Sequence, residues 1–261
     1  MTTSKMKAEK PLVSVVIPVY NAEKYIIKAL DSVLVQDVPC EIILVDDCGS
    51  DRSIEKAGSH LESLGFADYR IVTSGKNEGP GGARNLGVRN SQCEYIAFLD
   101  SDDVWAPLKL RKQLEVMESR SCLLCCTGRS IIDSEGNEAG AYIGVGESID
   151  LKSILKTNSI NLSSVLIRRE TALAHPFPTA KDIHEDYVCW LGILKNGGSA
   201  AGIDEPLLLY RKSGNQKTGS KLVSAKMHCR SLRLSGIDPV RSALYFVSYT
   251  FNGIRKHRGL K

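Results

Sequence analysis

Residues 13–21, with the sequence VSVVIPVYN, open on a run of β-branched side chains that ends at Pro18. An unbroken apolar run of this length is typical of a strand that is buried on both faces of a parallel sheet. Residues 22–35 then carry apolar side chains at three- and four-residue spacing, which predicts a helix that ends before Pro39. The segment therefore begins a strand-then-helix unit.

The same alternation continues along the chain. We expect strands at 41–45, 69–73 and 95–99 and helices at 53–64 and 83–90, the second after a glycine-rich turn at 78–82. Beyond residue 109 the pattern is less regular, with a helix to residue 117 and strands at 123–127 and 164–167. The alternation predicts an α/β fold with a Rossmann-like, mainly parallel sheet flanked by helices. Such sheets bind ligands beyond the carboxyl ends of their strands.

The composition of the 261 residues fits a globular α/β protein, because 43% of the side chains are hydrophobic. The net charge of +4 is unevenly distributed: residues 207–261 hold twelve basic residues and a single acid, whereas residues 1–206 hold 22 basic and 29 acidic residues. A basic tail favours anionic partners. Eight cysteines without a secretory signal predict a reducing, cytoplasmic setting, and no apolar run approaches the roughly 18 to 20 residues that span a bilayer.

Polar residues gather at three predicted strand ends, in the segments PVYN (18–21), Asp46-Asp47 and DSDD (100–103). A single Asp after a strand is usually a helix cap. Several carboxylates at one edge repel each other unless a divalent cation or hydrogen-bond donors offset their charge. The spacing of Asp100 and Asp102 suits Mg²⁺ or Mn²⁺, which take oxygen ligands, and the glycine-rich segment around Arg84 suits phosphate.

Taken in order, these segments resemble the inverting family 2 glycosyltransferases of the GT-A fold. The resemblance rests on VSVVIPVYN (13–21), EIILVDD (41–47), NEGPGGARN (77–85) and FLDSDD (98–103), and extends to Glu185-Asp186 with Trp190 and to Tyr210-Arg211. It covers roughly residues 12 to 211. The Gln/Arg-x-x-Arg-Trp motif of processive members is absent, so the resemblance implies transfer of a single sugar.

The resemblance implies a nucleotide-binding site made of six residues, namely Pro18, Tyr20, Asp47, Arg84, Asp100 and Asp102. The first three would contact the base, usually uracil, with Asp47 accepting from the ring N–H. Arg84 would lie at the base or phosphate and Asp100 would hold the ribose. Asp102 would bind the metal, Mn²⁺ or Mg²⁺, through the diphosphate. Asp103 is left without an assigned role.

Asp186, with Glu185 beside it, is the expected catalytic base. In an inverting transfer the acceptor hydroxyl attacks opposite the leaving nucleoside diphosphate, so the base must lie on the acceptor side. A neighbouring His184 is more often a surface salt-bridge partner than a catalytic group. Trp190 is either a sugar platform or a core residue. Arg211 is a weak candidate for phosphate binding, because the His that many relatives place after this segment is missing.

We expect a polar tail at 1–10, a GT-A domain at 11–212 and a basic extension at 213–261 with an amphipathic helix. The helix has an apolar stripe formed by Val240, Leu244, Val247, Phe251 and Ile254. This stripe would either lie on an anionic membrane surface or pack on the domain. The expected partners are a nucleotide-sugar donor and a glycan or undecaprenyl-diphosphate-linked acceptor, with no nucleic acid. The resemblance implies bacterial surface polysaccharide synthesis on the cytoplasmic side of the membrane. We expect a cytoplasmic protein, and the first of the two arrangements of the stripe would make it peripheral on the inner face of the cytoplasmic membrane.

Three other interpretations compete with this one. A haloacid dehalogenase-type phosphatase would use Asp100 and Asp102, which also follow a hydrophobic strand, but it leaves residues 13–47 unexplained. A nucleotide-binding protein without activity would be expected to lack the metal or base carboxylate, and both are present. Cys122, Cys125 and Cys126 have a C-x-x-C spacing, but without a second pair nearby they indicate a buried strand rather than zinc.

Overall fold

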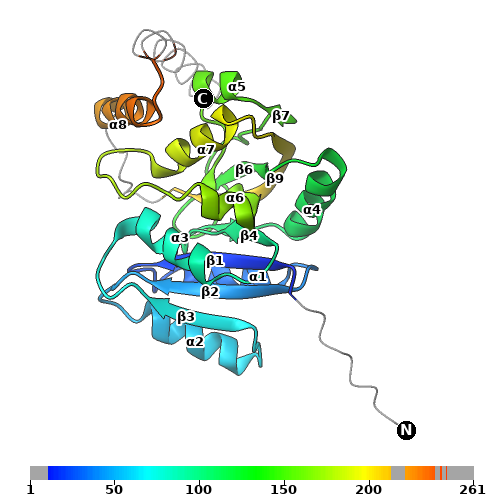
Figure 1. Ribbon diagram of the computed structural model, residues 1–261. Coiled ribbons are helices and arrows are strands. Elements are labelled where there is room, and N and C mark those ends of the chain that lie inside the picture. The colour runs from blue at the N-terminus through cyan, green and yellow to red at the C-terminus, as the bar shows by residue number, and fades with distance from the viewer. Residues whose placement is uncertain (1–10, 213–220, 239–241, 243–244, 246–261) are drawn as a thin grey trace.

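The computed structural model describes residues 11–212, 221–238, 242 and 245 (Figure 1). Its first half is a parallel sheet in the order β3-β2-β1-β4. The strands are β1 (Val13–Val19), β2 (Cys40–Asp46), β3 (Tyr69–Thr73) and β4 (Tyr95–Phe98). All four predicted strands of this half are confirmed. Their carboxyl ends lie at one edge, where Asp47 N–H donates to the carbonyl of Val19 over 3.1 Å.

The second half extends the same sheet and is mixed rather than parallel. It contains β5 (Val104–Trp105), β6 (Leu124–Ile132), β7 (Ser148–Ile149), β8 (Leu166–Arg168) and β9 (Ala200–Arg211). β8 pairs antiparallel with β4, and β6 pairs parallel with β9. The long strand β9 was not predicted, because Asp204, Glu205 and Pro206 interrupt its apolar pattern. The β6–β9 register shifts at Gly128, opposite this interruption.

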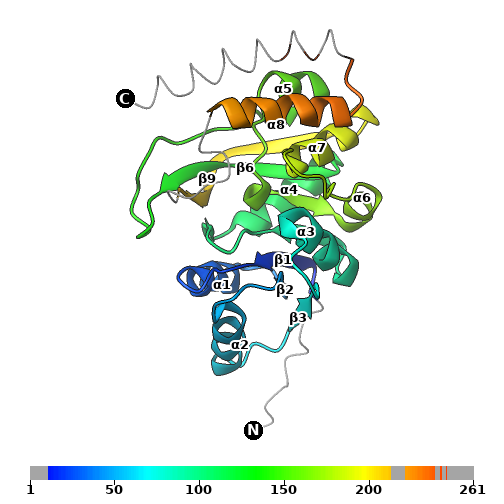
Figure 2. The same cartoon turned by 90° about the vertical axis from the view of Figure 1, so that its left-hand side faces the viewer.

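Helices cover both faces of the sheet, as the alternation predicts. One face carries α1 (Ile26–Leu34), α2 (Ser53–Ser63) and α4 (Lys109–Arg120). The other carries α3 (Gly79–Asn90), α5 (Leu151–Lys156), α6 (Arg169–Ala174), α7 (Glu185–Lys195) and α8 (Lys221–Leu234), with a short 3₁₀ turn, η1, at Leu162–Ser164. Along β1, Val15 and Ile17 belong to the first core and Val16 to the second. Figure 2 shows α1 and α2 on one side of the strands and α3 on the other.

The helix α3 begins earlier than expected and packs closely on the sheet. The prediction of a turn over 78–82 was wrong beyond its first residue, because α3 already begins at Gly79, which adopts a φ of +73°, and Pro80 lies in its first turn. A Cβ at Gly87 would lie 2.3 Å from Cγ1 of Val16. The absence of a side chain at Gly87 therefore lets α3 approach β1, which brings the first turn of α3 to the carboxyl edge of the sheet.

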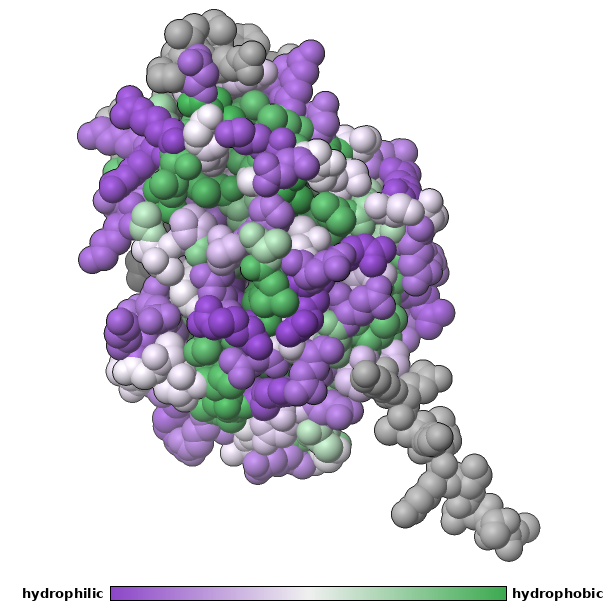
Figure 3. Space-filling view, in the orientation of Figure 1, coloured by the Kyte–Doolittle hydropathy of each residue, from purple (hydrophilic) through white to green (hydrophobic). Residues whose placement is uncertain are grey.

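The helix α8 lies against α7 at the end of the molecule opposite α2 (Figure 1). Leu232 is fully buried there, and the Ser231 hydroxyl accepts a 2.9 Å hydrogen bond from the backbone N–H of His184. The outward side of α8 exposes Lys226 and Arg230, and Figure 3 shows hydrophilic side chains projecting from this part of the surface. The expected extension thus contributes α8 to the core of the preceding domain.

The predicted amphipathic helix after residue 239 lies outside the described residues, apart from positions 242 and 245. Tyr245 is partly buried and packs against the core that α5 and α7 share. Within the part of the chain that the structure describes, no helix has both the length and the apolar composition needed to cross a membrane.

Candidate active site

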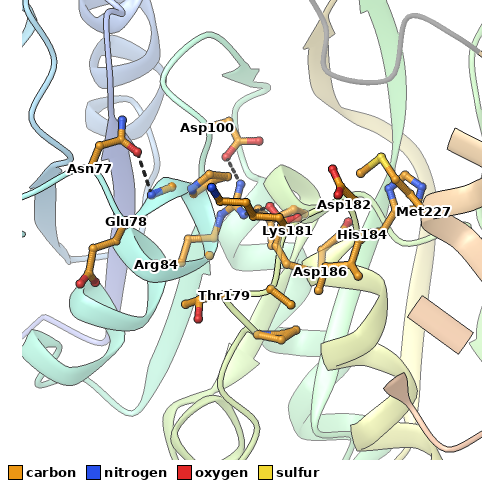
Figure 4. Close-up of a pocket in the computed structure, with 18 of the residues that line it drawn as sticks. Asn77, Glu78, Arg84, Asp100, Thr179, Lys181, Asp182, His184, Asp186 and Met227 are labelled. Carbon is orange, nitrogen blue, oxygen red and sulfur yellow. Dashed lines mark hydrogen bonds and ion pairs between the residues drawn. The ribbon is translucent and has the colours of Figure 1, made fainter. Parts of the chain in front are cut away.

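A cavity of about 730 Å³ opens at the carboxyl edge of the sheet. Its walls come from the start of α3, the residues after β4, the loop 178–184, the start of α7 and one side of α8. Figure 4 shows Asn77, Glu78 and Arg84 toward one end, and Asp182, His184 and Met227 toward the other, with Asp186 nearer the second group. The cavity therefore brings predicted nucleotide-binding residues and the predicted base into one space.

Arg84 joins the two predicted groups directly. Its guanidinium donates to Asp100 Oδ1 over 2.8 Å and to Glu185 Oε1 over 3.1 Å, and it lies over the ring of Phe177. Burial disfavours the charge of Arg84, but the two carboxylates outweigh this effect and raise its pKa. Arg84 thus fixes the distance between the end of β4 and the first turn of α7.

Asp186 lies in the first turn of α7, where the helix dipole favours negative charge. Its Oδ1 accepts a 2.7 Å hydrogen bond from the backbone N–H of Tyr187. Burial, reinforced by the charge of Glu185, raises the pKa of Asp186 to about 6. A carboxylate with this pKa is ionised at neutral pH and still basic enough to accept a proton from a hydroxyl as it reacts.

The loop after β4 holds three carboxylates in a small space. The backbone N–H of Asp100 donates to the Ser163 hydroxyl over 3.1 Å. Burial, followed by repulsion from Asp100, raises the pKa of Asp102 to about 6. Asp103 is buried, which raises its pKa well above the ordinary value; its Oδ1 accepts from the backbone N–H of Arg211, and its Oδ2 has no hydrogen-bond partner in the described residues. Crowded, partly desolvated carboxylate oxygens of this kind fit a hard divalent cation.

That cation would have few protein ligands. Among the described residues, no three His, Cys, Asp or Glu side chains are grouped so as to hold a metal ion. One carboxylate, from Asp102, with waters and substrate phosphates completing the shell, is the arrangement that Mg²⁺ commonly adopts. The residues present therefore fit a metal that binds together with a diphosphate.

Arg211, the weak candidate for phosphate binding, is only 1% exposed. Its Nε donates to the backbone carbonyl of Asp102 over 2.7 Å, one terminal nitrogen donates to the carbonyl of Asp133 over 2.7 Å, and the guanidinium stacks on Tyr25. The side chain is directed at backbone carbonyls, so the structure gives it a role in holding the Asp102 backbone. A phosphate contact by Arg211 is not supported by this geometry.

The three residues expected at the base do not line this cavity. Tyr20 is 52% exposed and Pro18 is half-buried at the end of β1. Asp47 is buried, and its Oδ1 accepts a 2.8 Å hydrogen bond from the backbone N–H of Glu78, which does line the cavity. Asp47 thus ties the end of β2 to the start of α3, and its contact with a nucleobase stays a prediction.

Two side chains near Asp186 had roles that the sequence left open. Trp190 is fully buried, with its ring 6.0 Å from that of Phe177 in an edge-to-face arrangement, so the sugar-platform interpretation was wrong and the core interpretation is confirmed. His184 lines the cavity, and its ring nitrogen lies 3.4 Å from the backbone carbonyl of Ser224 on α8. No acidic partner of its ring occurs in the described residues, in contrast to the expected salt bridge.

Several cavity residues were not found from the sequence. Lys181 comes from an irregular loop, and Val223 and Met227 come from α8, which was not predicted. Neither segment carries a motif, and their approach to Asp186 depends on the packing of α8 on α7. Cys125 and Cys126 lie buried in β6, in agreement with the predicted strand.

The sequence family follows from a direct comparison: the model of glycosyl transferase family 2 matches residues 14–173. The chain belongs to this family. The match spans Asp47, Arg84 and the Asp100–Asp103 loop, so the resemblance and the GT-A fold are confirmed, and the protein is a glycosyltransferase. The phosphatase alternative was wrong, because this match accounts for the strands from residue 14 onward as well as for Asp100 and Asp102.

Individual family 2 relatives align along nearly the whole chain. A Bacillus subtilis (strain 168) protein named for teichuronic acid biosynthesis, TuaG, is 36% identical over 95% of this chain and 98% of its own length. The Escherichia coli protein WfgD, a UDP-Glc:alpha-D-GlcNAc-diphosphoundecaprenol beta-1,3-glucosyltransferase, is 32% identical over 94% of this chain and 95% of its own.

Solved structures with lower identity share the fold. S. aureus TarS 1–349 in complex with UDP-GlcNAc superimposes with a TM-score of 0.70 at 20% identity, covering 87% of this chain and 66% of that one. The mannosyltransferase PcManGT from Pyrobaculum calidifontis, in complex with GDP-Man and Mn²⁺, gives a TM-score of 0.65 at 17% identity over 92% and 69% of the two chains.

Proposed function

We propose that the chain is an inverting glycosyltransferase that moves one sugar from a UDP-sugar to a hydroxyl of a lipid-linked glycan in bacterial surface polysaccharide synthesis. The observation that carries the proposal is the cavity in which Arg84 joins Asp100 to Glu185, with Asp186 in the next position of α7. The E. coli relative supports the donor and acceptor classes, since its name specifies UDP-Glc and a diphosphoundecaprenol acceptor.

In the proposed reaction, the acceptor hydroxyl enters from the end of the cavity that α8 lines. Asp186 takes the hydroxyl proton while the oxygen forms a bond to the anomeric carbon, and the bond from that carbon to the diphosphate breaks on the opposite side. The nucleoside diphosphate leaves with the electron pair of the broken bond. Glu185 stays paired with Arg84, which keeps the first turn of α7, and with it Asp186, in place.

The ribose and diphosphate of the donor would bind at the other end of the cavity, with Asp100 at the ribose. The base would extend beyond the cavity to Pro18, Tyr20 and Asp47. Asp102, whose backbone Arg211 holds, would be the protein ligand of a divalent cation, Mn²⁺ or Mg²⁺. When bound, such a cation offsets the negative charge that develops on the departing diphosphate. The structure of PcManGT with GDP-Man and Mn²⁺ supports the same expectation for this fold.

We also propose that the protein acts at the inner face of the cytoplasmic membrane, where a lipid-linked acceptor would be presented. The outward side of α8 supports peripheral contact, because it exposes Lys226, Arg230 and Arg233, and the helix contains no acidic residue. Clustered basic residues favour anionic lipid. Co-flotation with vesicles that contain phosphatidylglycerol, and not with phosphatidylcholine vesicles, is the expected result.

A nucleotide-sugar screen tests the proposed function. With Mn²⁺ present, a UDP-sugar should raise the melting temperature, and the same UDP-sugar should support transfer to GlcNAc carried on a diphosphate lipid. If donors raised the melting temperature but none of them supported transfer to such an acceptor, the chain would be a nucleotide-binding protein without activity. If other nucleotides stabilised the protein and UDP did not, the result would contradict the donor assignment.

A further inference from the structure

Lys181 is a cation in the active-site cavity that the predicted donor contacts do not include. It lies in the loop 178–184 between α6 and α7, and its side chain is exposed and lines the cavity (Figure 4). In the described part of the chain, its ammonium group takes part in no hydrogen bond and no ion pair. A lysine in this position has its full charge available for a ligand.

The loop that carries Lys181 is attached to the protein at both ends. At its start, Asn85 of α3 donates to the carbonyl of Phe177 over 2.8 Å and accepts from the N–H of the same residue over 2.9 Å. The carbonyl of Pro178 would lie 3.1 Å from a Cβ at Gly81, so the loop passes directly over the first turn of α3. At its end, the backbone N–H of His184 is bonded to α8. Lys181 is therefore held close to the glycine-rich segment whose composition suits phosphate.

The rest of the cavity is poor in available positive charge. Its acidic lining residues are Glu78, Asp100, Asp182, Glu185 and Asp186. The charge of Arg84 is shared between Asp100 and Glu185. Two further cations are also paired already, since Arg230 lies 3.5 Å from Asp182 and Lys76 lies 3.9 Å from Glu78. A diphosphate that entered this cavity would be repelled by the carboxylates unless additional cations were present. One cation is expected at Asp102, and Arg211 is directed at backbone carbonyls instead.

We propose that Lys181 binds the diphosphate of the nucleotide-sugar donor, in the role that the position after Tyr210-Arg211 lacks in this sequence. The inference rests on the proposed function. An ammonium group beside the leaving diphosphate donates charge-assisted hydrogen bonds, and these strengthen as the bond to the anomeric carbon breaks and negative charge grows on the oxygen. Lys181 therefore contributes to donor affinity and also to the rate of transfer.

The test compares uridine, which has no phosphate, with UDP, in the presence of Mn²⁺. Lys181→Met should weaken UDP binding about tenfold, as expected for one charge-assisted contact, and should leave uridine binding within about twofold of wild type. Lys181→Arg keeps the charge and should retain UDP affinity within about threefold. Lys152→Met, which removes an exposed lysine on α5 outside this cavity, is the matched control and should leave both affinities unchanged.

The outcomes separate this inference from the proposed function. Equal UDP affinity in the wild type and Lys181→Met would overturn the role of Lys181 while leaving the glycosyltransferase proposal standing. If Lys181→Met raised only the KM for the acceptor, the ammonium group would contact the acceptor instead, which would also overturn the inference. Equal losses for uridine and UDP would show general damage to the pocket and would also overturn it. A wild-type protein that binds no nucleoside diphosphate at all would contradict the proposed function itself.

Discussion

The change of Asp186 to Asn separates chemistry from donor binding more sharply than any other substitution in the cavity. Asn has nearly the same shape, and its carbonyl oxygen can accept the 2.7 Å hydrogen bond from the Tyr187 N–H. It cannot accept a proton from the acceptor hydroxyl. Since a positioned general base contributes about 10²- to 10⁴-fold, we expect kcat to fall by about that factor. Donor affinity should change less than about threefold.

The same substitution has a predicted effect on stability that depends on pH. Burial raises the pKa of Asp186 from 3.8 to about 6, so the folded state binds this proton more tightly than the unfolded chain does. The wild type therefore loses stability as the pH rises from about 4 through about 6. A shift of about two units corresponds to about 3 kcal/mol, which we discount to about 2 kcal/mol because the side chain is partly exposed. Asp186→Asn removes this cost above pH 6.

The assays are nucleoside diphosphate release with acceptor present, isothermal titration of the donor, and urea unfolding at pH 5 and pH 8. The wild type should gain activity as the pH rises through about 6, because the ionised carboxylate is the active form. The variant should be inactive, bind donor, and be more stable than the wild type at pH 8. An Asp186→Asn protein that keeps a tenth or more of the wild-type kcat would refute the assignment of the base.

Three further changes test the surroundings of the site. Arg84→Gln leaves Asp100 and Glu185 without their shared cation, so we expect the unfolding free energy to fall by about 2 kcal/mol and the activity to be lost; a variant as stable as the wild type in urea would show that this bridge does not hold α7 in place. Asp102→Asn should abolish the Mn²⁺ dependence of UDP binding, measured by titration with and without EDTA, whereas an unchanged metal response would move the metal site elsewhere. Gly87→Ala places a Cβ 2.3 Å from a methyl group of β1, so the unfolding free energy should drop by about 2 kcal/mol, and a loss below about 0.5 kcal/mol would contradict the close packing of α3.

The sequence specifies the first half of the fold well, because β1, β2 and β4 are built on apolar runs between helices. Such a run has one stable environment, the middle of a parallel sheet. The motif residues at the strand ends then meet at one edge. This is why Arg84 and Asp100, which are sixteen positions apart, were both expected at the site and are found bonded to each other.

The second half was predicted less well for a physical reason. The strand β9 contains Asp204, Glu205 and Pro206, and α8 presents a buried face that includes Ser231 and His228, so neither shows a clean apolar period. Their positions depend on partners distant in the sequence. The end of the cavity that α8 lines, including Met227, could therefore be found only from the folded structure, and so could the backbone carbonyls to which Arg211 donates.

The most direct test of the central claim is the structure of a complex with Mn²⁺ and an intact UDP-sugar. We predict that the diphosphate and the cation lie at Asp102, that the sugar occupies the cavity beside Arg84, and that Asp186 faces the anomeric carbon from the side opposite the diphosphate. A nucleotide bound outside this cavity, or an Asp186 carboxylate on the same side of the sugar as the diphosphate, would contradict an inverting transfer with Asp186 as the base.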